Sequence, residues 1–160
     1  MIVISWLNYV IPVLSIFITY FLGTLNSKNN LKKDVNLQRY ETFYVPYMSK
    51  LLAAYNFTDD PHKSPFEVRG VYFDMIMNNM HLLDSSSSKL IPSYYKRFLD
   101  LLEFENGNDD FQFAQKRYDE IFIEISTAIL KEAEELSKSL NYPNLAKTIL
   151  TSVDHRTYVR

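Results

Sequence analysis

The chain has 160 residues, and 17 Lys and Arg against 19 Asp and Glu give it a net charge of −2 at pH 7. This balance argues against the broad basic surface of a nucleic-acid-binding protein, so we predict no nucleic-acid partner. The absence of Cys excludes thiol nucleophiles, disulfides and thiolate zinc sites, and the three glycines form neither a Walker phosphate loop nor a dinucleotide fingerprint, so we predict no cofactor.

The first 27 residues contain no charged side chain. Residues 2–22 read IVISWLNYVIPVLSIFITYFL, close to the roughly 20 mainly apolar residues that a helix needs to cross a hydrocarbon core. A secretory signal peptide is one alternative, but it would begin with basic residues and have a shorter apolar stretch. A buried core helix is the other alternative. We predict a transmembrane helix over residues 1–25.

Small and polar residues recur along one face of this predicted helix. Such a face can support association with another span, but a monomeric span can also tolerate these residues. Both interpretations stay open, and the first predicts a homo-oligomer formed through the span. The residues of this face are Ser5, Asn8, Pro12, Ser15 and Thr19.

Basic residues follow the span. Residues 26–33 include weak helix formers such as Asn29 and Asn30, and we predict a basic juxtamembrane hinge there. Because basic residues beside a span stay on the cytoplasmic side, we predict a single-pass protein of the cell membrane, with its N-terminus outside and its C-terminal domain in the cytoplasm. The residues expected to flank the lipid bilayer are Lys28, Lys32, Lys33 and Arg39.

Residues 34–153 have the periodicity of a helical domain, without competing strand alternation. Pro46 interrupts the first domain helix or starts its second half. Ser64–Glu67 matches a capping box and starts a second helix that reaches residue 83. The run Ser85–Ser88 predicts a loop. The face of the first domain helix consists of Tyr40, Tyr44, Tyr47, Leu51 and Tyr55.

A third helix is predicted from Pro92 to Gly107, which favours a helix end. A fourth begins at the acid pair 109–110 and ends near Asn141, about 30 residues or roughly 45 Å later. A short last helix and a tail over residues 154–160 follow. The predicted fold is all-α: one N-terminal transmembrane helix and a cytoplasmic antiparallel bundle of about four to five helices.

The three histidines, His62, His81 and His155, have no metal-ligand spacing in the sequence. His62 with Asp59 and Asp60 is the best local cluster for a divalent ion, but the same composition is typical of a polar turn. The sequence therefore assigns no metal ligand and no catalytic residue.

Tyrosine is frequent, with twelve in the chain. A tyrosine prefers an apolar surrounding for its ring and a partner or water for its hydroxyl. The tyrosines of the first domain helix therefore fit a face that binds a partner, and they equally fit the core of a small bundle. In the first interpretation, the interaction residues are Tyr40, Tyr44, Tyr47 and Tyr55.

The segment Arg39–Tyr47 reads RYETFYVPY. It resembles a segment of small uncharacterised single-span membrane proteins of Gram-positive bacteria and their prophages, where a membrane helix and a basic stretch precede an R-Y-E-x-F-Y-x-P motif that opens a helical domain. The resemblance covers residues 1–55. It implies this architecture and a phage- or envelope-related setting, and it implies no activity and no functional residue.

These observations predict a membrane-tethered, non-enzymatic helical protein that binds an unknown protein partner at the inner membrane face. The span, the basic flank, the tyrosine-rich helix and the lack of a catalytic constellation are the basis of this hypothesis. One alternative is a metal-dependent enzyme with a scattered site in the bundle, built from His62, His81 and acids. The other is a structural subunit of a membrane complex that packs through the span.

Overall fold

The computed structural model describes residues 19–21, 24, 27–54 and 60–157, and all regular structure in these ranges is helical. The predicted all-α fold is confirmed for this part of the chain. None of the helices described there is long and apolar enough to cross a membrane. Most of the predicted span, residues 1–25, lies outside the described residues. The chain divides into two compact units, residues 1–36 and residues 37–160.

The segment that was expected to form a hinge is helical: residues 27–36 of the first unit and residues 37–39 of the second unit are all in helical conformation. Single-residue helix propensity is a weak determinant, so a few Asn and Ser residues do not prevent a helix here. Bending at this segment stays a prediction. The exposed side chains of the helix include Lys28, Lys32, Lys33, Leu31 and Val35.

A π-helical turn in the second unit, η1 (Tyr40–Tyr44), leads directly into α2 (Val45–Ala54). The N–H of Val45 donates to the carbonyl of Tyr40, five residues earlier. Pro46 has no N–H, and its ring would crowd the carbonyl four residues before it in a regular α-helix. The wider π turn lies directly before Pro46, where the missing N–H and the proline ring would disrupt a regular α-helix. The chain therefore stays helical past Pro46.

The segment after α2 contains several short elements. The residue at the N-cap of α3 is Pro65 rather than Ser64, and the first helical hydrogen bonds, from Val68 and Arg69, go to the carbonyl of Pro65. The run Ser85–Ser88 is a helical turn rather than the predicted loop, because the side chain of Asp84 accepts from the N–H of Ser85 and caps it. The elements are η2 (Pro61–Lys63), α3 (Phe66–Asn78), η3 (Met80–Leu82) and α4 (Ser85–Ser88).

The last helices follow the predicted order. Gly107 has φ 89°, and Asn141 has φ 58°; both end helices in the left-handed region that glycine and asparagine tolerate best. The long fourth helix has 27 residues and begins at Ala114, after a short 3-10 turn. The last helix continues past the predicted boundary at residue 153. These elements are α5 (Ile91–Glu105), η4 (Asp109–Phe111), α6 (Ala114–Leu140) and α7 (Leu145–Thr157).

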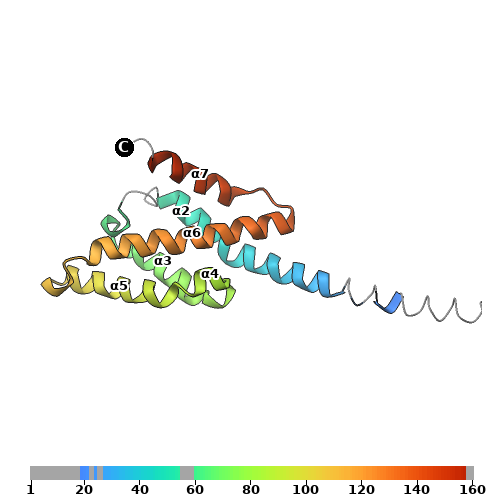
Figure 1. The fold of residues 1–160 in the computed structure, drawn as a ribbon, viewed down its shortest axis with the longest axis horizontal. Coiled ribbons are helices and arrows are strands. Elements are labelled where there is room, and N and C mark those ends of the chain that lie inside the picture. Colours follow the sequence, from blue (N-terminus) through green and yellow to red (C-terminus); the bar gives the residue numbers. More distant parts are fainter. Residues whose placement is uncertain (1–18, 22–23, 25–26, 55–59, 158–160) are drawn as a thin grey trace, which may run out of the picture. The chain divides into compact units, whose positions relative to one another are not determined.

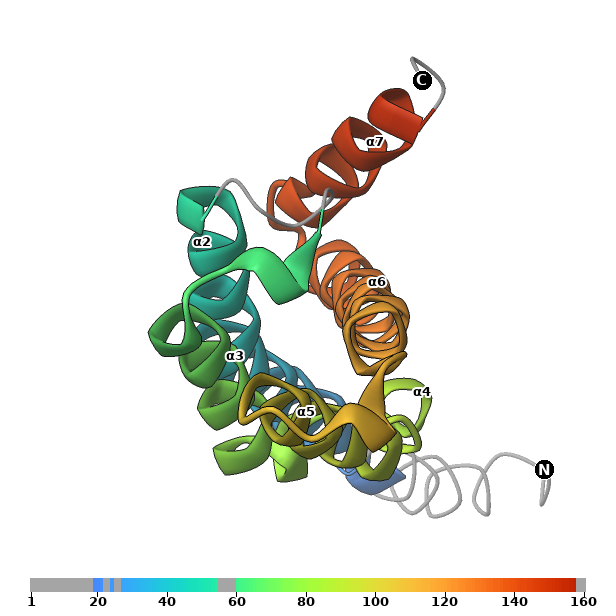
Figure 2. The same ribbon diagram turned by 90° about the vertical axis from the view of Figure 1, so that its left-hand side faces the viewer.

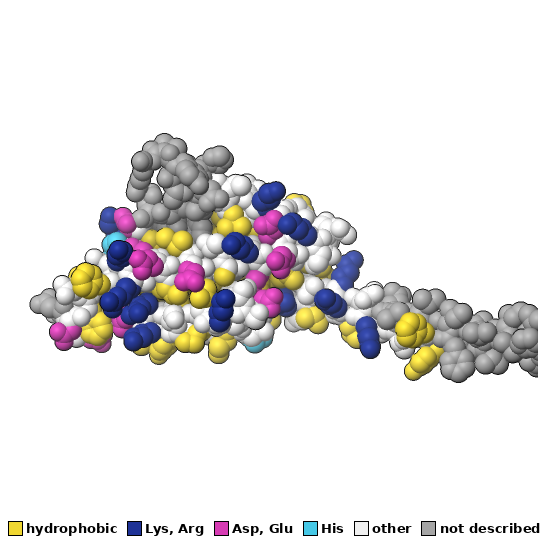
Figure 3. Space-filling model, in the orientation of Figure 1, with side chains coloured by type: hydrophobic (Ala, Val, Ile, Leu, Met, Phe, Trp, Pro, Cys, Tyr) yellow, Lys and Arg dark blue, Asp and Glu magenta, His cyan; other side chains and the backbone are white. Residues whose placement is uncertain are grey.

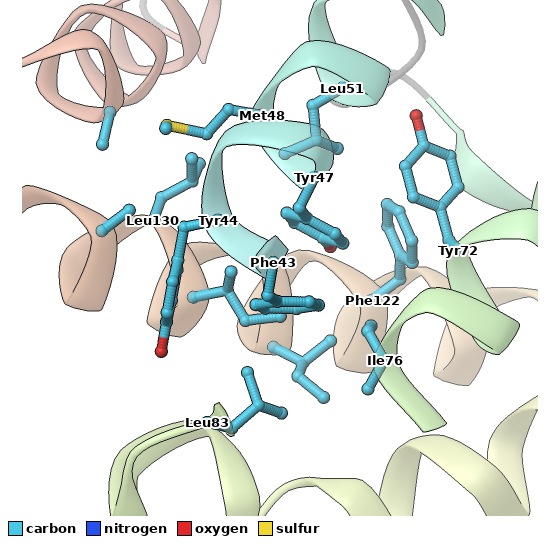
Figure 4. Close-up of a cluster of buried hydrophobic side chains, with 14 of the residues drawn as sticks. Phe43, Tyr44, Tyr47, Met48, Leu51, Tyr72, Ile76, Leu83, Phe122 and Leu130 are labelled. Carbon is cyan, nitrogen blue, oxygen red and sulfur yellow. The ribbon is translucent and has the colours of Figure 1, made fainter. Parts of the chain in front are cut away.

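Helix α6 is the centre of the second unit, with contacts to α4, α5, α7, η1 and η2 (Figure 1). The view along the bundle shows α2, α3, α5 and α6 around one common interior (Figure 2). Aromatic rings fill much of this interior: Tyr47 contacts Tyr72 and Tyr72 contacts Phe122, with ring centroids 5.9 and 5.4 Å apart. Figure 4 shows these rings among the aromatic side chains of η1, Phe43 and Tyr44, and aliphatic side chains of α2, α3 and α6 such as Leu51, Ile76 and Leu130.

Candidate functional site

The tyrosines predicted to bind a partner lie in the core of the domain. Tyr44 and Tyr47 have no exposed surface, and Tyr40 is 4% exposed. Tyr55 lies outside the described residues. The three described side chains therefore belong to the bundle core, which was the other interpretation of the sequence. In this folded state, no partner can reach them.

Two of these tyrosines join the first domain helix to α6 through their hydroxyl groups. The hydroxyl of Tyr47 lies 2.7 Å from Oγ of Ser126. The hydroxyl of Tyr44 donates to Oε2 of Glu132 over 2.8 Å. Burial, reinforced by the adjacent carboxylate, raises the pKa of Tyr44 far above 10, so this phenol is a hydrogen-bond donor at neutral pH.

The side chain of Glu132 is 5% exposed, and its carboxylate accepts hydrogen bonds from Tyr44, from backbone N–H groups and from serine hydroxyls. Besides Tyr44, the backbone N–H groups of Asp84 and Ser87 donate to it over 3.1 and 3.0 Å. The hydroxyls of Ser86 and Ser87 donate to Oε1, the former over 2.5 Å. The serine run therefore binds a buried carboxylate at the start of α4. Through these bonds and its bond to Tyr44, Glu132 of α6 connects α6 to both α4 and η1.

Arg39 was predicted to flank the membrane, and the structure places it against the folded domain. Its Nε donates to the carbonyl of Leu82 over 2.7 Å, and its Nη2 donates to the hydroxyl of Tyr44 over 3.3 Å. The guanidinium group also lies 6.0 Å from the centre of the Tyr44 ring. These contacts give Arg39 a place in the same polar network as Glu132.

His62 lies in a cluster that the sequence only partly indicated. Its backbone N–H and its Nδ1 lie 2.7 and 2.6 Å from the two carboxylate oxygens of Asp119 on α6. Potential ligand atoms of Asp60, His62 and Asp119 lie within 4.8 Å of one another. The carboxylate of Asp60 also pairs with Lys63, at 2.5 Å. Of the residues proposed with His62, Asp59 lies outside the described part of the chain.

The other two histidines do not add to this cluster. His81 is exposed on η3 and forms no ligand group with other described residues. The side chain of His155 lies outside the described part of the structure. The arrangement of His62, Asp60 and Asp119 suits a divalent cation in the type of its donor atoms, since imidazole and carboxylate groups bind such ions together.

A pocket lies beside this cluster, between α2, the η2 turn, α3 and α6. It is partly open to solvent and narrow, with about 10 Å³ of water-sized space, room for about one water molecule. Its polar side includes Arg69, which is 4% exposed and pairs with Glu105 through Nη2 at 2.7 Å. The residues that line it are Leu51, Pro61, Ser64, Arg69, Tyr72, Tyr118 and Phe122.

The sequence pattern did not point to Arg69, Asp119 or Glu132 as candidate site residues. A signal for two of them was present: Arg69 is three residues before Tyr72, and Glu132 is three residues after Ile129, so each lies on the apolar face of its helix. A charged residue on such a face must be paired or hydrogen-bonded when the helix packs. Asp119 gave no such signal, because its partner His62 is 57 residues away in the chain.

Comparison with protein-family models, with curated proteins and with solved structures finds no match for this chain.

Proposed function

We propose that this chain is a membrane-tethered, non-enzymatic helical protein that binds a protein partner at the inner face of the membrane. The observation that carries the proposal is the charge-free stretch of residues 1–27, followed by a basic flank. The exposed lysines of residues 27–39 support it, because each would be attracted to anionic headgroups by about 1 kcal/mol near a bilayer surface.

Cell fractionation tests the tether. The full-length chain is expected in the membrane pellet after ultracentrifugation, and it should resist extraction with alkaline carbonate. Replacing Ile11 and Ile16 together by Lys should release it, because a Lys at the centre of a span costs roughly 2.5–3.5 kcal/mol. The double variant Lys32→Ile and Lys33→Ile, outside the span, should stay in the pellet. An unmodified chain that stays in the supernatant without detergent would contradict the tether.

The proposed orientation has its own test. Asn56–Thr58 is an acceptor sequence for N-glycosylation. In a glycosylating microsomal system, this site should stay unmodified if the domain faces the cytoplasm. Glycosylation there, abolished by Asn56→Gln, would reverse the proposed orientation while leaving the tether intact.

We propose that partner contacts involve exposed apolar side chains of α3 and α5, since the tyrosines of η1 and α2 are buried. Tyr95 and Leu99 are 45% and 42% exposed and lie one turn apart on α5. Phe73 of α3 contacts the ring of Tyr95, so the surfaces of the two helices adjoin. Figure 3 shows hydrophobic side chains along the lower edge of the domain, where α5 runs in Figure 1.

A photo-crosslinking amino acid placed at Tyr95 or Leu99 in the full-length membrane protein tests this face. A discrete crosslinked species is expected from these positions and not from Lys131, an exposed residue of α6. Equal labelling at all three positions, or labelling only at Lys131, would contradict the proposed face. If the setting is phage-related, expression of the chain should also change plaque formation by competing phage.

A metal-dependent enzyme is the second candidate function, and the convergence of Asp60, His62 and Asp119 favours it. Elemental analysis of the purified full-length chain should then find a stoichiometric divalent metal that Asp119→Asn removes. A metal-free protein after purification without chelators would count against this alternative. A structural subunit, the third candidate, would give crosslinked oligomers in membranes that depend on Ser5, Asn8, Ser15 and Thr19.

A further inference from the structure

Three side chains from two distant segments bring metal-binding atoms together at the η2 turn. Asp60 and His62 lie two residues apart there, and Asp119 lies on α6. A ring nitrogen of His62 and one carboxylate oxygen of each aspartate lie within 4.8 Å of one another. Ligand atoms that lie about 2.0–2.2 Å from one zinc ion are roughly 3 Å apart, so side-chain movements of about 1–2 Å would bring all three to a common ion.

The fold holds two of these ligands in place. Oδ1 of Asp119 accepts from the backbone N–H of His62 over 2.7 Å, and Oδ2 faces Nδ1 of the imidazole at 2.6 Å. The turn is closed by a backbone hydrogen bond from Lys63 to Asp60, and Pro61 between them is buried. Hydrogen bonds to ligating groups orient those groups toward a metal, so the histidine and the carboxylate of α6 are in position before an ion binds.

The cluster is accessible from one side. The side chains of His62 and Asp119 are 16% and 17% exposed, whereas that of Asp60 is 42% exposed. Asp60 pairs with Lys63, whose side chain is 70% exposed. An exposed ion pair of this kind contributes little to stability, so a divalent cation can displace the lysine from the carboxylate.

The donor atoms select a class of ion. Magnesium and calcium prefer oxygen ligands alone, whereas imidazole suits zinc and the neighbouring transition metals. We propose that Asp60, His62 and Asp119 bind one divalent transition-metal ion of the zinc type, with a remaining position for water, and that this ion fastens the η2 turn to α6. The inference rests on the metal-binding part of the second candidate function and names its ion. It requires no reaction, and its failure would leave the tether and the partner-binding face unaffected.

Thermal unfolding of the full-length chain in detergent tests the site. The chain carries no histidine tag, is stripped of metal with EDTA and dialysed, and then receives zinc chloride in one arm and magnesium chloride in the other. Zinc at about 100 times its Kd should raise Tm by roughly 5–10 °C, because an ion that binds only the folded chain stabilises it by mass action. Magnesium should leave Tm within about 1 °C. No rise with zinc, or an equal rise with magnesium, would overturn the proposal.

Variants assign the effect to the cluster. Asp119→Asn should abolish the rise with zinc, whereas His81→Gln, which changes an exposed histidine of η3 outside the cluster, should keep it. If Asp119→Asn does not fold, Asp60→Asn decides the question, because it changes the most exposed ligand and keeps the pair of His62 and Asp119. Asp60→Asn should raise the zinc concentration at half-maximal rise at least about tenfold, since even changes beside the ligands cost 10–100-fold in affinity. An unchanged zinc dependence in Asp60→Asn would contradict the site.

Discussion

At the scale of single residues, two buried side chains of opposite charge have different surroundings. Glu132 accepts hydrogen bonds from Tyr44, from the start of α4 and from two serine hydroxyls. Arg69 pairs with Glu105 through Nη2, and among the described residues its Nε and Nη1 have no hydrogen-bond partner. Since removing one partner of a buried polar contact leaves the other unsatisfied, the complete network around Glu132 should contribute to stability.

Replacing Glu132 by Gln should lower the free energy of unfolding by about 2–3 kcal/mol, because an amide loses the charge-assisted bonds and points hydrogens at existing donors. The matched change Glu135→Gln, on the exposed side of α6, should stay within about 0.5 kcal/mol. Urea unfolding of the full-length chain in detergent, followed by circular dichroism, measures both. Equal midpoints for the two variants would show that the network adds nothing to stability.

At the scale of elements, two glycines occupy opposite situations. Gly70 lies inside α3 with helical geometry, and an added Cβ would meet nothing within 4 Å. Gly107 follows α5 with φ 89°, where an L side chain is strained whatever the space. The same substitution should therefore change stability in opposite directions at the two positions.

Gly70→Ala should raise the free energy of unfolding by about 0.5–1 kcal/mol, because alanine restricts the unfolded chain and suits a helix. Gly107→Ala should lower it by about 1–2 kcal/mol, the cost of a left-handed conformation for a side chain with Cβ. Thermal unfolding of both variants beside the unmodified chain measures the difference. A destabilising Gly70→Ala would mean that something packs against this face of α3.

At the scale of the whole molecule, the described interior contains six buried tyrosines. Burial raises the pKa of Tyr72 to about 12, and it raises the pKa values of Tyr44, Tyr47, Tyr94 and Tyr118 still further above 10. Below about pH 10, these groups are neutral in both the folded and the unfolded chain, and their contribution to stability is complete. Above that pH, the unfolded chain loses protons first, so stability falls.

The chain should therefore unfold cooperatively in alkali, with each buried tyrosine adding up to about 1.4 kcal/mol per pH unit to the loss above pH 10. Tyrosinate absorbance and helix content, followed together in a pH titration, should change in one transition for the buried groups. Tyr47→Phe should make the loss of stability with pH less steep. Ionisation of all twelve tyrosines near pH 10 with helix content unchanged would contradict a buried aromatic interior.

The sequence predicted local features well where one helix carries its own signal. The order of the helices in the described domain, the helix ends at Gly107 and Asn141 and the apolar face of α6 follow from periodicity and from residues that tolerate positive φ. Pro46 indicated that the first domain helix would be irregular there. The sequence did not predict the form of the irregularity, which is the π turn η1. The serine run became a helical turn because Asp84 caps it and Glu132 binds it.

By itself, therefore, the sequence determined that this domain is helical and which residues can line its helix faces, since both depend on neighbours three or four positions apart. Only the tertiary structure decided which faces are buried: it placed Tyr40, Tyr44 and Tyr47 inside rather than on a surface. It also joined His62 to Asp119, and it buried two nitrogens of Arg69 without a hydrogen-bond partner in the part of the chain that the structure describes. These contacts link residues far apart in the chain, and their formation depends on how whole helices pack, which no local pattern encodes.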